Sequence, residues 1–392
     1  MAERDEPHPL GPSFEDLGAD APLLREIQRV LLSSTGPVNW ELARQIGIAS
    51  ASWGAEDPAP TDDDRRAFEE AVRVAELKVQ AFTGLEPPND IPRVDPVRRA
   101  QWVQANIDGL KALVEPAAVK LAEAVERAQG EAAPAESTGF AQQMLRQLSP
   151  LLLGAQVGSV LGYLAQHVLG QYDIAVPRSE TPALLFVVPN IAAFERDWSL
   201  QPTEFRTWVA LHEVTHRFEF ARPWALGRFR SLLEDFLSTV ELDVTGLQAR
   251  LESLDMSDPQ AMQDMLQGEE GLFGAVLDPE QRLKLGRIQA FMASAEGYGD
   301  HVTHAIGKDL LPSYGRIEEA MKRYMLGEAD LVFERLLGIE MKREQYRLGR
   351  AFCDTVAQLS DEATLARMWD SPDAMPSLPE LAEPRLWLAR TV

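Results

Sequence analysis

The chain has 392 residues, of which 45% are hydrophobic and 25% charged, and its 38 Lys+Arg against 61 Asp+Glu give a formal net charge of −23. This composition is that of a globular protein, and the length admits one large domain or two smaller ones. The acidic balance argues against a nucleic-acid partner and against a membrane partner of anionic lipid. The single cysteine, Cys353, excludes a disulfide framework and a thiolate zinc knuckle, and we interpret it as a buried structural thiol.

The N-terminal third predicts an acidic tail followed by helices. Residues 1–21 contain no basic stretch leading into an apolar run, so we interpret them as a solvated tail and not as a secretory signal. Apolar residues at helical spacing predict a helical region over 22–129, with helices from about residue 22, over 40–53, over 65–82 and from about 96 to 128. The stretch GEAAPAESTG at 130–139 is the clearest internal linker.

The next stretch, 147–172, carries no Asp, Glu, Lys or Arg and allows two interpretations. A transmembrane helix is one, but Pro150 and several polar side chains interrupt the span. We prefer a fully buried helix. Gly154, Gly158 and Gly162 recur every four residues, and such a bare face lets another helix or a sheet approach closely.

After this stretch the pattern changes once to that of a strand and then returns to helices. The short apolar run ALLFVV at 183–188 is the best strand candidate. Helices are expected over 203–220, 223–253, 279–304, 316–326 and 329–359. The sequence therefore predicts a fold that is mainly α with a small β-sheet, in which region 139–392 packs with region 22–129 as one large unit.

The residues LHEVTHRFEF at 211–220 contain the pattern HExxH. On a helix His212 and His216 lie on one face, so both imidazoles can bind one Zn²⁺, and Glu213 can reach a water at the metal and act as general base. A third ligand must come from elsewhere, and the best candidate is Glu296, with Asp300 one turn later orienting a ligand histidine. His304, two turns from Glu296 on the same side, remains an alternative ligand.

Several of these segments together resemble a bacterial zincin-like family described as hydrolases or zinc-dependent metalloproteases, some of them associated with deazaflavin coenzyme biosynthesis. The segments are LHEVTHRFEF, VLGQYDI (168–174), VVPNIAAFE (187–195), EGYGDHV (296–302), KREQYRLGRAF (342–352) and LPELAEPRLWLAR (378–390). The resemblance covers the chain from about residue 40 to its C-terminus. It implies a zincin-like metallopeptidase architecture with extra helices, with His212, His216 and Glu296 as ligands and Glu213 as base. Thr303-His304 depart from the Met-Asp expected after EGYGDHV.

Three features around this site keep alternatives open. A donor for the developing oxyanion is needed, and the eligible side chains are Tyr298, His301, His304 and Tyr346, with Tyr298 and His301 preferred. The strand at 183–188 is either an edge strand that pairs with extended substrate or an interior strand. The roughly eighty residues between His216 and Glu296 form either a lid or an added helical layer.

The sequence thus indicates a cytoplasmic zinc hydrolase, most simply a metallopeptidase that acts on a peptide or small amide. The competing hypotheses are a hydrolase of a small-molecule amide and a non-catalytic zincin-like scaffold.

Overall fold

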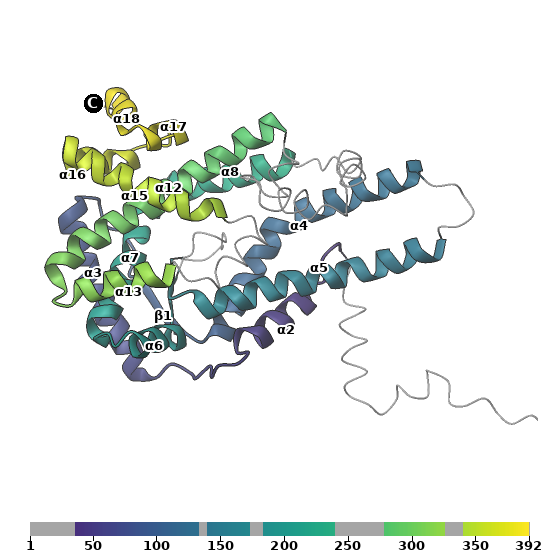
Figure 1. Cartoon of the computed structure of the whole chain (residues 1–392), viewed down its shortest axis with the longest axis horizontal. Coiled ribbons are helices and arrows are strands. Elements are labelled where there is room, and N and C mark those ends of the chain that lie inside the picture. Colours follow the sequence, from purple (N-terminus) through teal and green to yellow (C-terminus); the bar gives the residue numbers. More distant parts are fainter. Residues whose placement is uncertain (1–35, 133–138, 173–182, 240–277, 326–339, 392) are drawn as a thin grey trace, which may run out of the picture.

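The computed structural model describes residues 36–132, 139–172, 183–239, 278–325 and 340–391. This part of the chain is mostly helical and carries a three-stranded mixed sheet (Figure 1). The predicted fold class, mainly α with a small sheet, is confirmed. The acidic tail 1–21, the helix expected from about residue 22 and most of the linker at 130–139 lie outside the described residues.

The N-terminal helices lie close to where the sequence predicts them. They are α2 (Trp40–Ala51), α3 (Asp62–Thr83) and α4 (Arg99–Ala132). A capping box of Thr61 and Asp64 starts α3, and Gly84, with a φ of 65°, ends it in the left-handed conformation. Strand β1 (Arg93–Val97) was not predicted, because the following helix was expected to begin at Pro96. Pro96 lies inside β1, which tolerates it as an edge strand.

Helix α5 (Gly139–His167) contains the uncharged stretch only as far as His167, because residues 170–172 of that stretch form strand β2 instead of helix. The glycine face of α5 packs on α2. A Cβ at Gly154 or Gly158 would meet the carbonyl oxygen of Asn39 or Ala43, so the expected close approach of another helix is confirmed. The expectation of a fully buried helix is wrong for the opposite face, where Leu152 is 65% exposed. By length and composition alone, Leu148–His167 could cross a membrane. In Figure 1, α4 and α5 extend side by side away from the other helices.

The sheet has the order β1-β3-β2, with β3 (Ala183–Val187) parallel to β1 and antiparallel to β2 (Gly170–Tyr172). The strand predicted at 183–188 is therefore confirmed, and of its two possible positions it takes the interior one. All five of its side chains are buried. Leu184 and Phe186 face the core formed with α3 and α7, while Leu185 faces the core formed with α2, α4 and α5.

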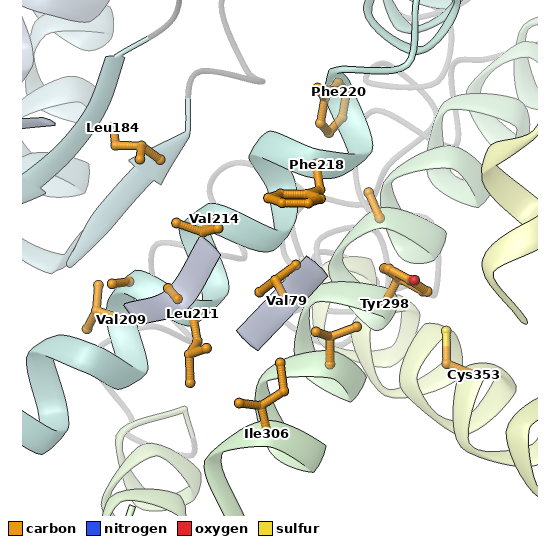
Figure 2. Close-up of a cluster of buried hydrophobic side chains, with 14 of the residues drawn as sticks. Val79, Leu184, Val209, Leu211, Val214, Phe218, Phe220, Tyr298, Ile306 and Cys353 are labelled. Carbon is orange, nitrogen blue, oxygen red and sulfur yellow. The ribbon is translucent and has the colours of Figure 1, made fainter. Parts of the chain in front are cut away.

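The rest of the described chain is helical, and α7 (Pro202–Phe220) runs through its centre. Figure 2 shows Val214 and Phe218 of α7 between Leu184 of the sheet and Tyr298 of α12. The other elements are α6 (Val188–Asp197), α8 (Ala225–Thr239), α12 (Pro279–Leu310), α13 (Tyr314–Met325), α15 (Glu340–Leu359), α16 (Glu362–Ala366), the 3₁₀ turn η1 (Arg367–Trp369), α17 (Leu378–Ala382) and α18 (Pro384–Thr391).

Helix α12 is held against α15 through two glycines. A Cβ at Gly297 would overlap the backbone of Gly349, and a Cβ at Gly349 would overlap the carbonyl oxygen of Ala293. The two helix backbones therefore touch directly, close to Glu296. Cys353, on α15, is fully buried as expected. Much of the segment between His216 and Glu296, residues 240–277, lies outside the described residues, so a lid and an added helical layer both stay open as predictions.

Candidate metal centre

Both histidines of the HExxH pattern lie on one face of α7. Pro202 occupies the first turn of this helix, where its missing N–H costs no hydrogen bond, and most of the following side chains are buried. The Nε2 atoms of His212 and His216 are 3.2 Å apart, and the ring planes are nearly perpendicular. Trp208, one turn earlier, stacks parallel to His212 with ring centroids 6.3 Å apart. The helix thus presents two ring nitrogens at one point.

Glu296 of α12 completes a three-residue cluster at this point. Its Oε2 atom lies 3.7 Å from His212 Nε2 and 3.6 Å from His216 Nε2. A tetrahedral zinc ion with bonds of about 2.1 Å would hold its ligand atoms about 3.4 Å apart. The spacing and the His₂Glu donor set therefore fit zinc, and within the described residues these three side chains form a cluster that could hold a metal ion.

Carboxylates lie behind both imidazoles. His216 Nδ1 is 2.8 Å from Oε2 of Glu219, a fully buried side chain on the next turn of α7. His212 Nδ1 is 3.8 Å from Oδ1 of Asp300, too far for a hydrogen bond but on the side that the sequence predicts. Sequence reasoning missed Glu219. An available signal was its position three residues after His216, between the apolar residues Phe218 and Phe220.

The cluster is electrostatically coupled. Burial would raise the pKa of Glu296, but the neighbouring imidazoles of His212 and His216 outweigh it and hold this pKa well below its usual range. Burial would lower the pKa of His216, but Glu219 and Glu296 outweigh it and raise this pKa well above its usual range. The three side chains therefore favour a positive charge among them, and a divalent cation can supply that charge.

Glu213 is 94% buried and lies against strand β2. Its side chain is so close to Gly170 that a Cβ at that position would be 2.7 Å from both Cγ and Oε1 of Glu213. Glu213 follows His212 directly on α7, so the chain itself keeps this carboxylate close to the histidine pair. Its role as general base stays a proposal.

Helix α12 turns Tyr298 and His301 away from the cluster. Tyr298 is 1% exposed and makes an edge contact with Trp369 in the hydrophobic core. It is two residues from Glu296, and side chains two apart point to opposite sides of a helix. His301 lies between two carboxylates, with Nδ1 2.6 Å from Asp354 Oδ1 and Nε2 3.0 Å from Glu362 Oε2. The structure thus does not bring either predicted oxyanion donor to the cluster.

His304 also makes its contacts elsewhere. Its Nδ1 atom lies 2.7 Å from the hydroxyl of Tyr314 and 3.4 Å from Oε1 of Glu318. Of the two ligand candidates on α12, Glu296 is the one that reaches both histidines of α7. The side chain of Tyr346 lies outside the part that the structure describes.

Comparisons with known proteins now place the chain. A model of the zincin-like metallopeptidase family matches residues 38–388. The chain belongs to this family. It is also similar to a protein from Chloroflexus aurantiacus whose crystal structure is described as "a putative hydrolase with a novel fold", at 31% identity and a TM-score of 0.64 over 90% of this chain and 98% of that one. A search of curated proteins finds no match.

Proposed function

We propose that this zincin-like protein is a zinc-dependent metallopeptidase in which Glu213 is the general base. The observation that carries the proposal is the convergence of His212, His216 and Glu296, from two helices, with ligand atoms at the spacing a zinc ion requires. An HExxH helix alone supplies two ligands. The third, eighty positions later in the chain, leaves one tetrahedral position for water or substrate, as in catalytic zinc sites.

Each side chain would have a distinct role. Zinc held here would polarise a substrate carbonyl and make a water acidic. Glu213 would take a proton from the attacking water and return it to the leaving amine. Glu219 would hold His216, and Asp300 would orient His212, so that both present Nε2 to the metal. The buried carboxylate of Glu219 beside Nδ1 of His216 favours the tautomer that this requires.

We propose a peptide as the substrate. The family description and the donor set favour peptide hydrolysis, whereas a small-molecule amide would use the same chemistry. Because the imidazoles, Glu296 and Glu213 are all in place, we favour an enzyme over a scaffold whose metal site has no catalytic role. We place the enzyme in the cytoplasm, with no nucleic-acid or membrane partner.

A metal and cleavage assay tests this. The purified chain is loaded with zinc, its metal content is measured, and cleavage of a mixed peptide library is followed by mass spectrometry. We expect one zinc per chain and peptide cleavage that a chelator stops. The variant His212→Ala should lose both the bound zinc and the cleavage. Zinc binding with hydrolysis of amides but of no peptide would assign the small-molecule alternative. A chain that takes up no zinc would support the scaffold.

A further inference from the structure

Strand β2 carries a glycine at the point where it passes Glu213. Gly170 pairs with Phe186 of β3 in the antiparallel register, so both residues point to the same face of the sheet. Phe186 on that face is fully buried and stacks on Phe68 of α3. On this face of the sheet Phe186 therefore fills the core with a large side chain, whereas its neighbour Gly170 contributes only backbone atoms.

The space left by the missing side chain holds the carboxylate of Glu213. A Cβ added at Gly170 would be 2.7 Å from Cγ, 2.7 Å from Oε1 and 2.9 Å from Cδ of Glu213. These distances are below any normal carbon contact, so the two side chains exclude each other. The three nearest atoms all belong to the part of Glu213 beyond its own Cβ.

The strand cannot easily move away from α7 to make room. Gln171, the next residue, points to the other face and exchanges two amide hydrogen bonds with Asn106 of α4, at 3.1 and 2.8 Å. Val187 N–H donates to the carbonyl of Leu169 at 2.9 Å, which holds the start of β2 to β3. The residues on either side of Gly170 are thus hydrogen-bonded to α4 and β3, while Gly170 itself faces Glu213 of α7.

We infer that Gly170 is a positioning residue for Glu213, because its bare backbone fixes where the carboxylate of the general base lies relative to the histidine pair. This inference rests on the proposed role of Glu213. It assigns no contact between Gly170 and substrate or metal. Any side chain at position 170 displaces the carboxylate but leaves His212, His216 and Glu296 in place, since no ligand atom is among the nearest neighbours of that Cβ.

A double-mutant cycle on thermal stability tests the contact without any substrate. Gly170→Ala is made in the wild type, in Glu213→Ala and in Glu213→Gln, and Tm is measured for each zinc-loaded protein. Overpacking should lower Tm of the wild type by about 2–6 °C. In the Glu213→Gln background, which keeps the shape of the side chain, Gly170→Ala should lower Tm by the same amount. In the Glu213→Ala background, which lacks the atoms in contact, Gly170→Ala should lower Tm little or not at all. Gly227→Ala, where a Cβ would meet nothing within 4 Å, is the matched control and should act equally in all three backgrounds.

Catalysis provides the second measurement. In Gly170→Ala we expect zinc content to stay at the wild-type value, KM to change little and kcat to fall about 100-fold, because the base is misplaced and the metal is not. If Gly170→Ala fails to fold while Gly170→Ala/Glu213→Ala folds, the inference is supported. An equal Tm loss in the wild type and in Glu213→Ala overturns it, as does wild-type kcat in Gly170→Ala. A wild type without zinc-dependent hydrolysis would remove the proposed function, while the cycle would still report on the contact.

Discussion

His216 and Glu219 form a buried pair on α7, with Nδ1 2.8 Å from Oε2 and neither side chain more than 4% exposed. The carboxylate lies behind the imidazole, on the side away from His212 and Glu296. It fixes the ring orientation, so that Nε2 points at the proposed metal position. The HExxH pattern therefore does not reveal every contact that shapes the candidate site, because Glu219 lies outside the pattern.

Removing this carboxylate should weaken metal binding. We expect Glu219→Ala to lower zinc affinity about 10–100-fold, because the ring of His216 loses the partner that orients it. Competition with a chromophoric chelator measures the Kd. Glu195→Ala is the matched control, since Glu195 is also a buried carboxylate but pairs with Arg206, away from the cluster. Equal Kd values for Glu219→Ala and the wild type would disprove the orienting role.

Gly299 should be intolerant of even a methyl group. A Cβ at this position would be 2.9 Å from Cε1 of His216 and 3.3 Å from Cε1 of His212, so Gly299→Ala should push both rings off their common point. We expect zinc affinity to fall by at least about tenfold. Gly315→Ala adds a methyl group in open space and should bind zinc like the wild type. The prediction fails if both variants bind zinc equally well.

A substitution where α12 crosses α15 should lower the stability of the protein more than its catalytic activity. In Gly349→Ala the new Cβ would overlap the carbonyl oxygen of Ala293, and backbone cannot rotate away as a side chain can. We expect the free energy of unfolding to fall by about 1–3 kcal/mol or more. Gly227→Ala, in an open position of α8, should leave it unchanged or raise it by up to about 1 kcal/mol. Urea denaturation separates the two, and an unaffected Gly349→Ala would show that the helices do not touch there.

His301 should make stability depend on pH in the alkaline range. Burial would lower its pKa, but Asp354 and Glu362 outweigh burial and raise it from 6.5 to about 9. Because the folded pKa is the higher one, the stabilisation is complete below pH 6.5 and is lost as the pH rises through 9. We expect a loss of about 1–3 kcal/mol across this window, since both carboxylates are partly exposed.

The control for this pH effect is His301→Gln. This variant should be less stable than the wild type at pH 6, and the difference should shrink toward pH 9.5 as the wild type loses its charge. Urea denaturation at a series of pH values measures both proteins. A difference that stays constant with pH would show that His301 is not charged in the folded state.

The helices and the juxtaposition of His212 and His216 could be predicted because their signals are local. Apolar spacing defined α3 and α7, and the offset of four residues placed His212 and His216 on one face. The same spacing rule on a second helix singles out Glu296 and Asp300, and the structure brings Glu296 to the histidine pair. Strand β3 was found from its short apolar run, but β1 was missed because Pro96 reads as a helix start when the sheet edge that accepts it is not visible.

Contacts between distant segments could not be predicted. Residue type alone favours Tyr298 and His301 as oxyanion donors, and only the packing of α12 shows that they face Trp369, Asp354 and Glu362 instead. Gly170 carries no side chain, so its importance depends wholly on what lies opposite. The exposed Leu152 likewise depends on which faces of α5 find a partner.

Glu213→Gln tests the central claim most directly. The substitution keeps the shape of the side chain and removes its ability to accept and return a proton. We expect the variant to bind one zinc per chain with the affinity of the wild type, while its zinc-dependent hydrolysis of peptides falls by a factor of about 100 or more. Hydrolysis at the wild-type rate by zinc-loaded Glu213→Gln would contradict Glu213 as the general base and, with it, the proposed mechanism.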